Sequence, residues 1–176
     1  MASSDGRPQV GIVMGSDSDW ETMEAAAERL RILEIDYEVQ VMSAHRSPKV
    51  VRQYAESARR RGLGVVIAGA GGAAHLAGVV AAHTTLPVIG VPVVSGALGG
   101  LDALLATVQM PPGVPVATVA IGRGGADNAA ILAAQILAVK NRALRKRLER
   151  LKAELAESVE GKNIRLQRKI FPESPD

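Results

Sequence analysis

Residues 64–78, GVVIAGAGGAAHLAG, decide the fold of this chain. The run Gly64–Ala68 is short, apolar and rich in β-branched residues, which predicts a strand buried on both faces. A glycine-rich loop follows at once and leads into an expected helix at His75–His83. A buried strand that passes through a tight loop into a helix is the repeating unit of parallel α/β sheets.

Similar units precede and follow this one. The expected strands are Gln9–Met14, Tyr37–Met42, Gly64–Ala68, Pro87–Val91 and Val116–Ile121. The expected helices, each preceded by residues suited to turns and caps, are Ser18–Leu33, Pro48–Arg61, His75–His83, Leu98–Thr107 and Ala126–Val139. The repetition predicts one α/β domain at residues 9–140, with a five-stranded parallel sheet and right-handed crossovers.

A different element follows this domain, a helix expected at residues 141–160. Its apolar residues recur at spacings of four, three, four and four, and they are Leu144, Leu148, Leu151, Leu155 and Val159. They form one stripe on an otherwise charged helix. Because a five-stranded domain closes without it, we expect the helix to project and pack on a neighbouring subunit of a homo-oligomer. Packing on its own domain is the alternative.

The two ends of the chain are polar. Residues 1–8 are expected to form a flexible N-terminus that lacks the apolar run of a signal peptide. Residues 161–176 are expected to form a polar, basic tail that is disordered or covers a neighbouring subunit. A cytoplasmic location fits this organisation.

Composition excludes several classes of protein. The 176 residues suit a single domain, and the absence of cysteine excludes disulfides and thiolate metal sites. The three histidines lie on separate segments without an H-x-x-x-H pair, so no metal site is expected. No charge-free stretch of 18 apolar residues appears, so no membrane segment is expected. The net charge of +3 lies largely in residues 140–169, where glutamates interleave with the basic residues. Nucleic-acid binding is not expected either, because the aromatic residues that would stack on bases are nearly absent.

Ligands of open parallel sheets bind beyond the carboxyl ends of the strands, so the loops after the first three strands form the candidate site. The first loop, Met14–Trp20, has the sequence MGSDSDW. Its backbone N–H groups and the following helix end favour an anion, and Ser16 adds a hydroxyl donor. Asp19 is placed to accept hydrogen bonds from ribose hydroxyls. Plain helix capping by these serines and aspartates is the alternative.

The second loop, Ser43–Pro48, has the sequence SAHRSP, in which Ser47 suits an N-cap and Pro48 the first helical position. Arg46 is suited to a bidentate contact with phosphate, and Ser43 can donate a further hydrogen bond. His45 is left for proton transfer, because an imidazole can act first as acid and then as base near neutral pH. A structural or merely exposed histidine is the alternative.

The third loop, Ala68–Gly78, has the most unusual composition of the three. Its glycines let the backbone approach a ligand closely, and its alanines make a small apolar wall. Tight packing of strand on helix explains some of these glycines, but the histidine that follows favours a wall beside a ligand.

Two other classes share this architecture and are disfavoured by particular residues. A phospho-receiver domain needs an aspartate at the end of the third strand, where this chain has Ala68–Ala70, and no lysine follows the fifth strand. A flavin-binding module lacks aromatic residues to stack on the ring. A non-catalytic sensor of nucleotide phosphates remains open, although it leaves His45 without a purpose.

Taken together, the segments GSDSDW, SAHRSP and AGAGGAAHLAG resemble the signature set of the class I N5-carboxyaminoimidazole ribonucleotide mutases. The later stretches GVPV, VQMPPGVPVATVAIG and NAAILAAQIL are similar to the same family in order and spacing, and the similarity covers roughly residues 10–151. The resemblance implies a flavodoxin-like three-layer sandwich, an octamer in which C-terminal helices reach across subunits, and an enzyme of purine biosynthesis that needs no cofactor.

The resemblance also implies roles for single residues. Ser16, Ser43 and Arg46 are expected to hold the 5′-phosphate and Asp19 the ribose hydroxyls, while His45 is the expected general acid and base. The further substrate-binding residues implied are Ala44, Gly71, Ala73, Ala74, His75 and Leu76. The reaction implied is the reversible conversion of N5-carboxyaminoimidazole ribonucleotide into its 4-carboxy isomer. The class II relative, which carboxylates aminoimidazole ribonucleotide directly with carbon dioxide, is the nearest alternative.

Overall fold

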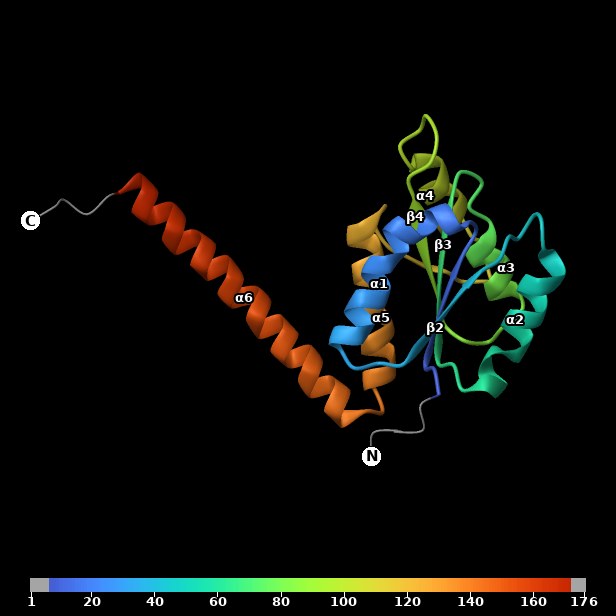
Figure 1. Ribbon diagram of the computed structural model, residues 1–176, viewed down its shortest axis with the longest axis horizontal. Coiled ribbons are helices and arrows are strands. Elements are labelled where there is room, and N and C mark those ends of the chain that lie inside the picture. Colours follow the sequence, from blue (N-terminus) through green and yellow to red (C-terminus); the bar gives the residue numbers. More distant parts are fainter. Residues whose placement is uncertain (1–6, 172–176) are drawn as a thin grey trace, which may run out of the picture.

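A computed structural model describes residues 7–171 of the chain (Figure 1). The strands are β1 (Val10–Met14), β2 (Tyr37–Val41), β3 (Val65–Gly71), β4 (Val88–Val93) and β5 (Ala117–Thr118). The helices are α1 (Trp20–Ile32), α2 (Pro48–Arg61), α3 (Leu76–Ala82), α4 (Leu101–Val108), α5 (Arg123–Ala138) and α6 (Arg142–Ile170), and a 3₁₀ turn, η1 (Asp17–Asp19), precedes α1.

The five strands form one parallel sheet in the order β2-β1-β3-β4-β5. In Figure 1, α1 and α5 lie on one side of the sheet, and α2 and α3 lie on the other. This strand order and this layering are those of flavodoxin-like proteins. The prediction of a three-layer α/β sandwich is therefore confirmed.

Alternation along the central strands divides the core in two. Ile12 faces the cluster that includes α1 and α5, whereas its neighbour Val13 faces the cluster that includes α2 and α3. The α5 side is built from small residues, and the buried alanines of that helix are Ala126, Ala129, Ala130, Ala133, Ala134 and Ala138. Such small side chains let the helices lie close to each other and to the sheet.

The third strand is longer than the sequence predicts. It continues past Ala68 to Gly71, and its last residues pair with β4 in the register Ala70↔Pro92 and Gly71↔Val93. The beginning of the expected third loop is therefore strand. Glycine and alanine have a low intrinsic preference for strand, but here the backbone pairs with the neighbouring strand β4. This places the glycines at the sheet edge on a rigid support.

The fifth strand is shorter than the expected Val116–Ile121. Gly90 accepts a hydrogen bond from Val119 N, and two residues later the same edge of β4 presents Pro92. Proline has no N–H to donate, so the regular ladder ends there, and the next bond runs from Gly122 N to Pro92 O at 2.9 Å. The fourth helix also starts late, at Leu101, since Gly99 and Gly100 both have positive φ.

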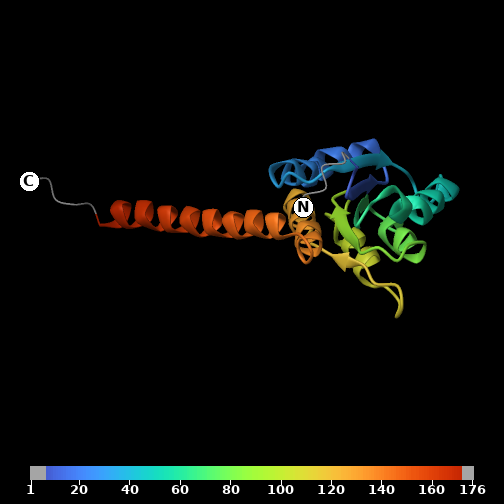
Figure 2. The ribbon, with the colours of Figure 1, turned by 90° about the horizontal axis from the view of Figure 1, so that it is seen from below.

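The last helix, α6, leaves the domain and projects far from it in both ribbon views (Figures 1 and 2). Asn141 caps its start by accepting a hydrogen bond from Leu144 N at 3.1 Å. Leu144, Leu148 and Leu151 are buried against the domain, whereas Leu155 is exposed. The beginning of the predicted stripe thus packs on its own domain, and the rest extends away from it.

The helix also continues to Ile170, past the expected end at residue 160, so much of the expected tail at 161–176 is helical. Most of its residues 164–170 are good helix formers, namely Arg, Leu, Gln and Lys, and they continue the helix past Gly161 and Asn163, which favour it less. The expected flexible N-terminus at 1–8 and the last residues of the expected tail fall largely outside the described residues. No helix within residues 7–171 is long and apolar enough to cross a membrane.

Candidate functional site

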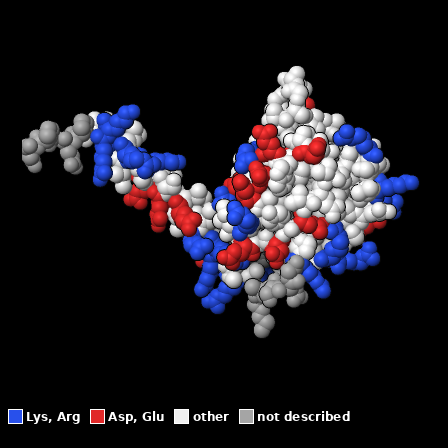
Figure 3. Space-filling view, viewed as in Figure 1, with Lys and Arg blue, Asp and Glu red and all other residues white. Residues whose placement is uncertain are grey.

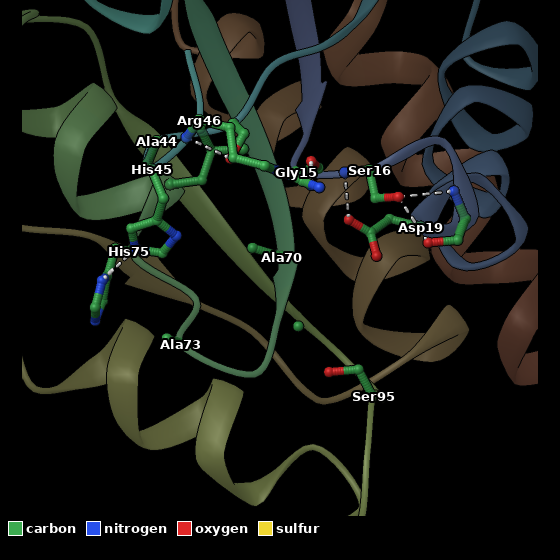
Figure 4. A pocket seen from close by; sticks show the side chains of 14 residues that line it. Gly15, Ser16, Asp19, Ala44, His45, Arg46, Ala70, Ala73, His75 and Ser95 are labelled. Carbon is green, nitrogen blue, oxygen red and sulfur yellow. Dashed lines mark hydrogen bonds between the residues drawn. The ribbon is translucent and has the colours of Figure 1, made fainter. Parts of the chain in front are cut away.

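A cavity of about 390 Å³ lies at the carboxyl ends of the first four strands. That volume is within the range of small-molecule sites, and the position is where parallel α/β sheets bind ligands. Its lining residues are Gly15, Ser16, Ser18, Asp19, Ser43, Ala44, His45, Arg46, Ala70, Gly71, Ala73, His75, Leu76 and Ser95. Figure 4 shows most of these side chains around the cavity.

The loop after β1 both caps a helix and lines the cavity. Ser16 is the N-cap of η1: its hydroxyl accepts a hydrogen bond from Ser18 N at 3.3 Å, and its own N–H donates to Asp19 Oδ2 at 3.0 Å. This is a capping box, so the capping interpretation of the loop is correct. It does not exclude ligand binding, because the same arrangement holds Ser16 and Ser18 at the cavity.

Among the described residues that line the cavity, Asp19 alone carries a carboxylate, and its side chain is buried. Burial raises the pKa of Asp19, while hydrogen bonds from the backbone N–H groups of Ser16 and Gly15 act in the opposite direction. A carboxylate with little remaining hydration is well suited to accept hydrogen bonds from the hydroxyl groups of a ligand.

The loop after β2 is fixed by a serine pair. Ser47 makes no capping bond to α2; instead its hydroxyl accepts from Ser43 N at 2.9 Å and donates to Ser43 O at 3.1 Å. Arg46 N donates to Ser43 Oγ at 3.1 Å, which tightens the same turn. The guanidinium of Arg46 donates to Gly15 O at 3.4 Å, so the first and second loops meet at one place.

Three hydroxyl groups and one guanidinium thus gather where these two loops meet, from Ser16, Ser18, Ser43 and Arg46. Figure 4 shows Arg46 and Ser16 on the same side of the cavity. Hydroxyls beside an arginine are a usual setting for a phosphate group. No group of three or more metal-binding side chains occurs within residues 7–171.

His45 and His75 contact each other at the cavity. His45 Nε2 lies 2.8 Å from His75 Nδ1, and the rings meet edge to face at an interplanar angle of 77°. Such a bond needs one ring nitrogen with a proton and one with a free lone pair, so at least one ring is neutral while it persists. The sequence predicts that His75 lies near the ligand but does not predict this pairing, because the two residues belong to different loops.

The third segment supplies the apolar side of the cavity through Ala70, Gly71, Ala73 and Leu76. Of the eleven residues expected at the site, the structure brings ten to the cavity; Ala74 lies instead in the core, 1% exposed. Its N–H bonds to Gly72 O in the turn before α3, which directs its side chain inward.

Sequence reasoning missed Gly15, Ser18, Ala70 and Ser95 as site residues. The first three neighbour expected residues, but Ser95 follows β4, a strand that received no site assignment. The rule that ligands lie at the carboxyl ends of parallel strands applies equally to β4 and would have found it.

The profile of the AIR carboxylase family matches residues 9–158 of this chain. The N5-carboxyaminoimidazole ribonucleotide mutase of Bacillus subtilis is 60% identical over 143 residues, which cover 81% of this chain and 88% of the relative. The enzyme of the same name from Mycobacterium tuberculosis is 57% identical over 162 residues, 92% of each chain.

Solved structures agree with these matches. The crystal structure of Treponema denticola PurE superposes with a TM-score of 0.78 at 27% identity and covers 95% of this chain and 100% of that one. A substituted form of PurE2 from the same organism gives a TM-score of 0.83 at 26% identity, over 92% of this chain and 99% of that one.

Proposed function

Because this chain belongs to the AIR carboxylase family, we propose that it is an N5-carboxyaminoimidazole ribonucleotide mutase of purine biosynthesis. It interconverts N5-carboxyaminoimidazole ribonucleotide and 4-carboxyaminoimidazole ribonucleotide. Relatives that carry this name are 54–60% identical to the chain, which covers most of their length. The observation that carries the proposal in the structure is one cavity that combines an anion-binding corner with an accessible histidine pair.

The anion-binding corner suits the 5′-phosphate of the nucleotide. Arg46 supplies a permanent positive charge, and the hydroxyls of Ser16 and Ser43 supply neutral donors. Asp19 lies beside Ser16 and takes the ribose hydroxyls as a hydrogen-bond acceptor. The imidazole ring and its carboxyl group then extend over Ala44, Gly71, Ala73 and Leu76 toward the histidines.

His45 performs the proton transfers in this proposal. As an imidazolium it donates a proton to the exocyclic nitrogen while the N–CO₂ bond breaks, which leaves carbon dioxide and neutral aminoimidazole ribonucleotide. The ring carbon C4 then attacks the carbon dioxide, and neutral His45 removes the proton from C4 to restore the aromatic ring. One proton is given and one is taken back, so the reaction is a balanced isomerisation.

The surroundings of His45 support this cycle. His75 holds one nitrogen of the His45 ring and thereby fixes the orientation of that ring. The small apolar wall of Ala70, Gly71 and Ala73 keeps carbon dioxide close to the ring carbon, so that its recapture is effectively intramolecular. Ala74 supports this wall from the core rather than touching the substrate.

We further propose that the protein works as a homo-oligomer, an octamer by analogy with its family, in the cytoplasm. Large apolar side chains are exposed on and next to α4 in the single chain: Leu98, Leu101, Leu105 and Val108. The distal half of α6 also exposes Leu155, Val159, Leu166 and Ile170. Apolar surface of this extent is typical of subunit interfaces.

The test is a conversion assay without ATP or added metal, in which the 4-carboxy product is followed by absorbance. We expect wild type to convert the N5-carboxylated substrate, and His45→Asn to bind it but to lose about 100-fold to 10,000-fold in kcat. Wild type that binds the nucleotide without converting it is a sensor and contradicts the proposal. Wild type that forms product only from aminoimidazole ribonucleotide and bicarbonate is instead a class II carboxylase.

A further inference from the structure

Ser95 lies at the cavity in a position that the roles above do not use. It follows β4, and its side chain reaches over the end of β3: a Cβ added to Gly71 would lie 2.5 Å from Ser95 Oγ and 2.8 Å from Ser95 Cβ. Any side chain at position 71 would therefore displace Ser95. The requirement for glycine at this position follows from the presence of the serine above it.

The Ser95 hydroxyl is also the only one at the cavity without a partner in residues 7–171. Ser16 Oγ donates to Asp17 Oδ1 at 3.1 Å, Ser18 Oγ donates to Ser16 Oγ at 2.9 Å, and Ser43 Oγ accepts from Arg46 N at 3.1 Å. No such bond is formed by Ser95 Oγ. Its donor is thus available to a ligand without the loss of any bond within the chain.

The order of the strands separates Ser95 from the phosphate corner. Arg46 and Ser43 follow β2 and Ser16 follows β1, whereas Ser95 follows β4, two strands away from β1. Neighbouring strands are about 4.8 Å apart, so Ser95 lies roughly 10 Å from the end of β1 and roughly 14 Å from the end of β2. Figure 4 shows Ser95 across the cavity from Arg46 and Ser16, with Ala70 between them. Ser95 and Gly71 line the same cavity as this corner, so a nucleotide anchored by its phosphate has room to extend toward Ser95.

Building on the proposed function, we propose that the Ser95 hydroxyl donates a hydrogen bond to the migrating carboxyl group. Arg46 is the only Lys or Arg among the residues that line the cavity, and it is occupied at the opposite end. A neutral donor beside an apolar wall binds a carboxylate better than it binds carbon dioxide, which is a weak acceptor. The bond therefore strengthens as carbon dioxide gains negative charge during attack by C4.

The experiment compares Ser95→Ala with wild type in two calorimetric titrations, one with the 4-carboxy nucleotide and one with aminoimidazole ribonucleotide, which lacks the carboxyl group. We expect Kd for the carboxylated nucleotide to rise about tenfold, the loss of one charge-assisted hydrogen bond, and Kd for the other to stay unchanged. Ser16→Ala is the matched control, and it should weaken both nucleotides by the same factor. The thermal midpoint of Ser95→Ala should equal that of wild type.

Equal weakening of both nucleotides by Ser95→Ala would place the hydroxyl on the ribose or phosphate and overturn the inference, and unchanged affinity for both would overturn it as well. A lower thermal midpoint would show that the hydroxyl stabilises the free chain, which also contradicts the inference. The conversion assay on wild type separates this failure from a failure of the proposed function, since that assay does not involve the variant.

Discussion

Arg29 of α1 and Asp127 of α5 form a bidentate ion pair, with Nε 2.7 Å from Oδ1 and Nη2 3.1 Å from Oδ2. The side chains are 21% and 32% exposed, so the pair is screened only in part. We expect Asp127→Asn to lower the free energy of unfolding by about 1 kcal/mol, measured by urea denaturation. Glu56→Gln, which breaks the more exposed Arg52–Glu56 pair, is the control and should change nothing measurable. Equal effects of the two variants would show that the partly buried, bidentate Arg29–Asp127 pair adds no more stability than the exposed pair does.

Two neighbouring glycines at the start of α5 should respond in opposite ways to alanine. A Cβ on Gly125 would lie 1.6 Å from Ala120 O, a backbone atom, whereas a Cβ on Gly124 meets nothing within 4 Å. Gly125→Ala should therefore destabilise the fold by about 3 kcal/mol or more, as overpacking does at its upper limit. Gly124→Ala should stabilise it by about 0.5–1 kcal/mol, because alanine favours helix. The measurement is the thermal unfolding midpoint of both variants. A Gly125→Ala protein as stable as wild type would contradict the close contact between Gly125 and the carbonyl oxygen of Ala120.

Asp19 predicts a pH-dependent stability. Burial raises the pKa of Asp19 in the folded chain, so the folded state holds the proton more tightly than the unfolded state does. The contribution of Asp19 to stability is therefore lost as pH rises through that pKa. Asp19→Asn removes this titration. The thermal midpoint of the variant minus that of wild type should therefore increase as the pH is raised from acidic to neutral. The idea fails if the difference between the two midpoints is flat with pH or has the opposite slope.

The histidine pair predicts graded effects on catalysis. His75→Ala should lower kcat by about tenfold to 100-fold, because the His45 ring loses its orienting partner. His75→Asn should recover part of that loss, since an amide can take either side of the hydrogen bond. Steady-state kinetics across pH would measure both variants. If the two variants have the same rate and the same pH profile, the bond has no role in positioning.

The exposed stripe of α6 predicts a change of assembly. Val159→Asp should raise the dissociation constant of the oligomer at least tenfold, as loss of a buried valine and burial of a charge require. Arg168→Asp changes charge on the opposite face of the helix and serves as the control. Light scattering over a range of protein concentrations would report the state of each variant. A wild type that is monomeric at all concentrations would contradict the oligomer proposal.

The repeating pattern of strands and helices predicts the sheet well, because each segment carries its own periodicity and its own turn residues. The exceptions depend on neighbours in space. Gly69–Gly71 becomes strand only because β4 pairs with it, and β5 ends early because Pro92 stands in the adjacent strand. That each of the three loops contributes residues to one cavity could be predicted from the sequence. The bond from His45 to His75 and the placement of Ser95 over Gly71 could not, since each joins loops that only the folded sheet brings together.

The length of α6 has a mechanical consequence. A helix of 29 residues is about 44 Å long, so a small rotation of the whole helix about its first turn, next to Asn141, would move its far end by a large distance. A rotation of about 5° at its base displaces the tip by roughly 4 Å, because arc length grows with the arm. The packing of Leu144 and Leu148 on the domain therefore determines the position of the far end of the helix, which is rich in Lys and Arg (Figure 3). Its basic residues are Lys162, Arg165, Arg168 and Lys169. Small changes in packing at the domain are in this way amplified at the far end of the helix.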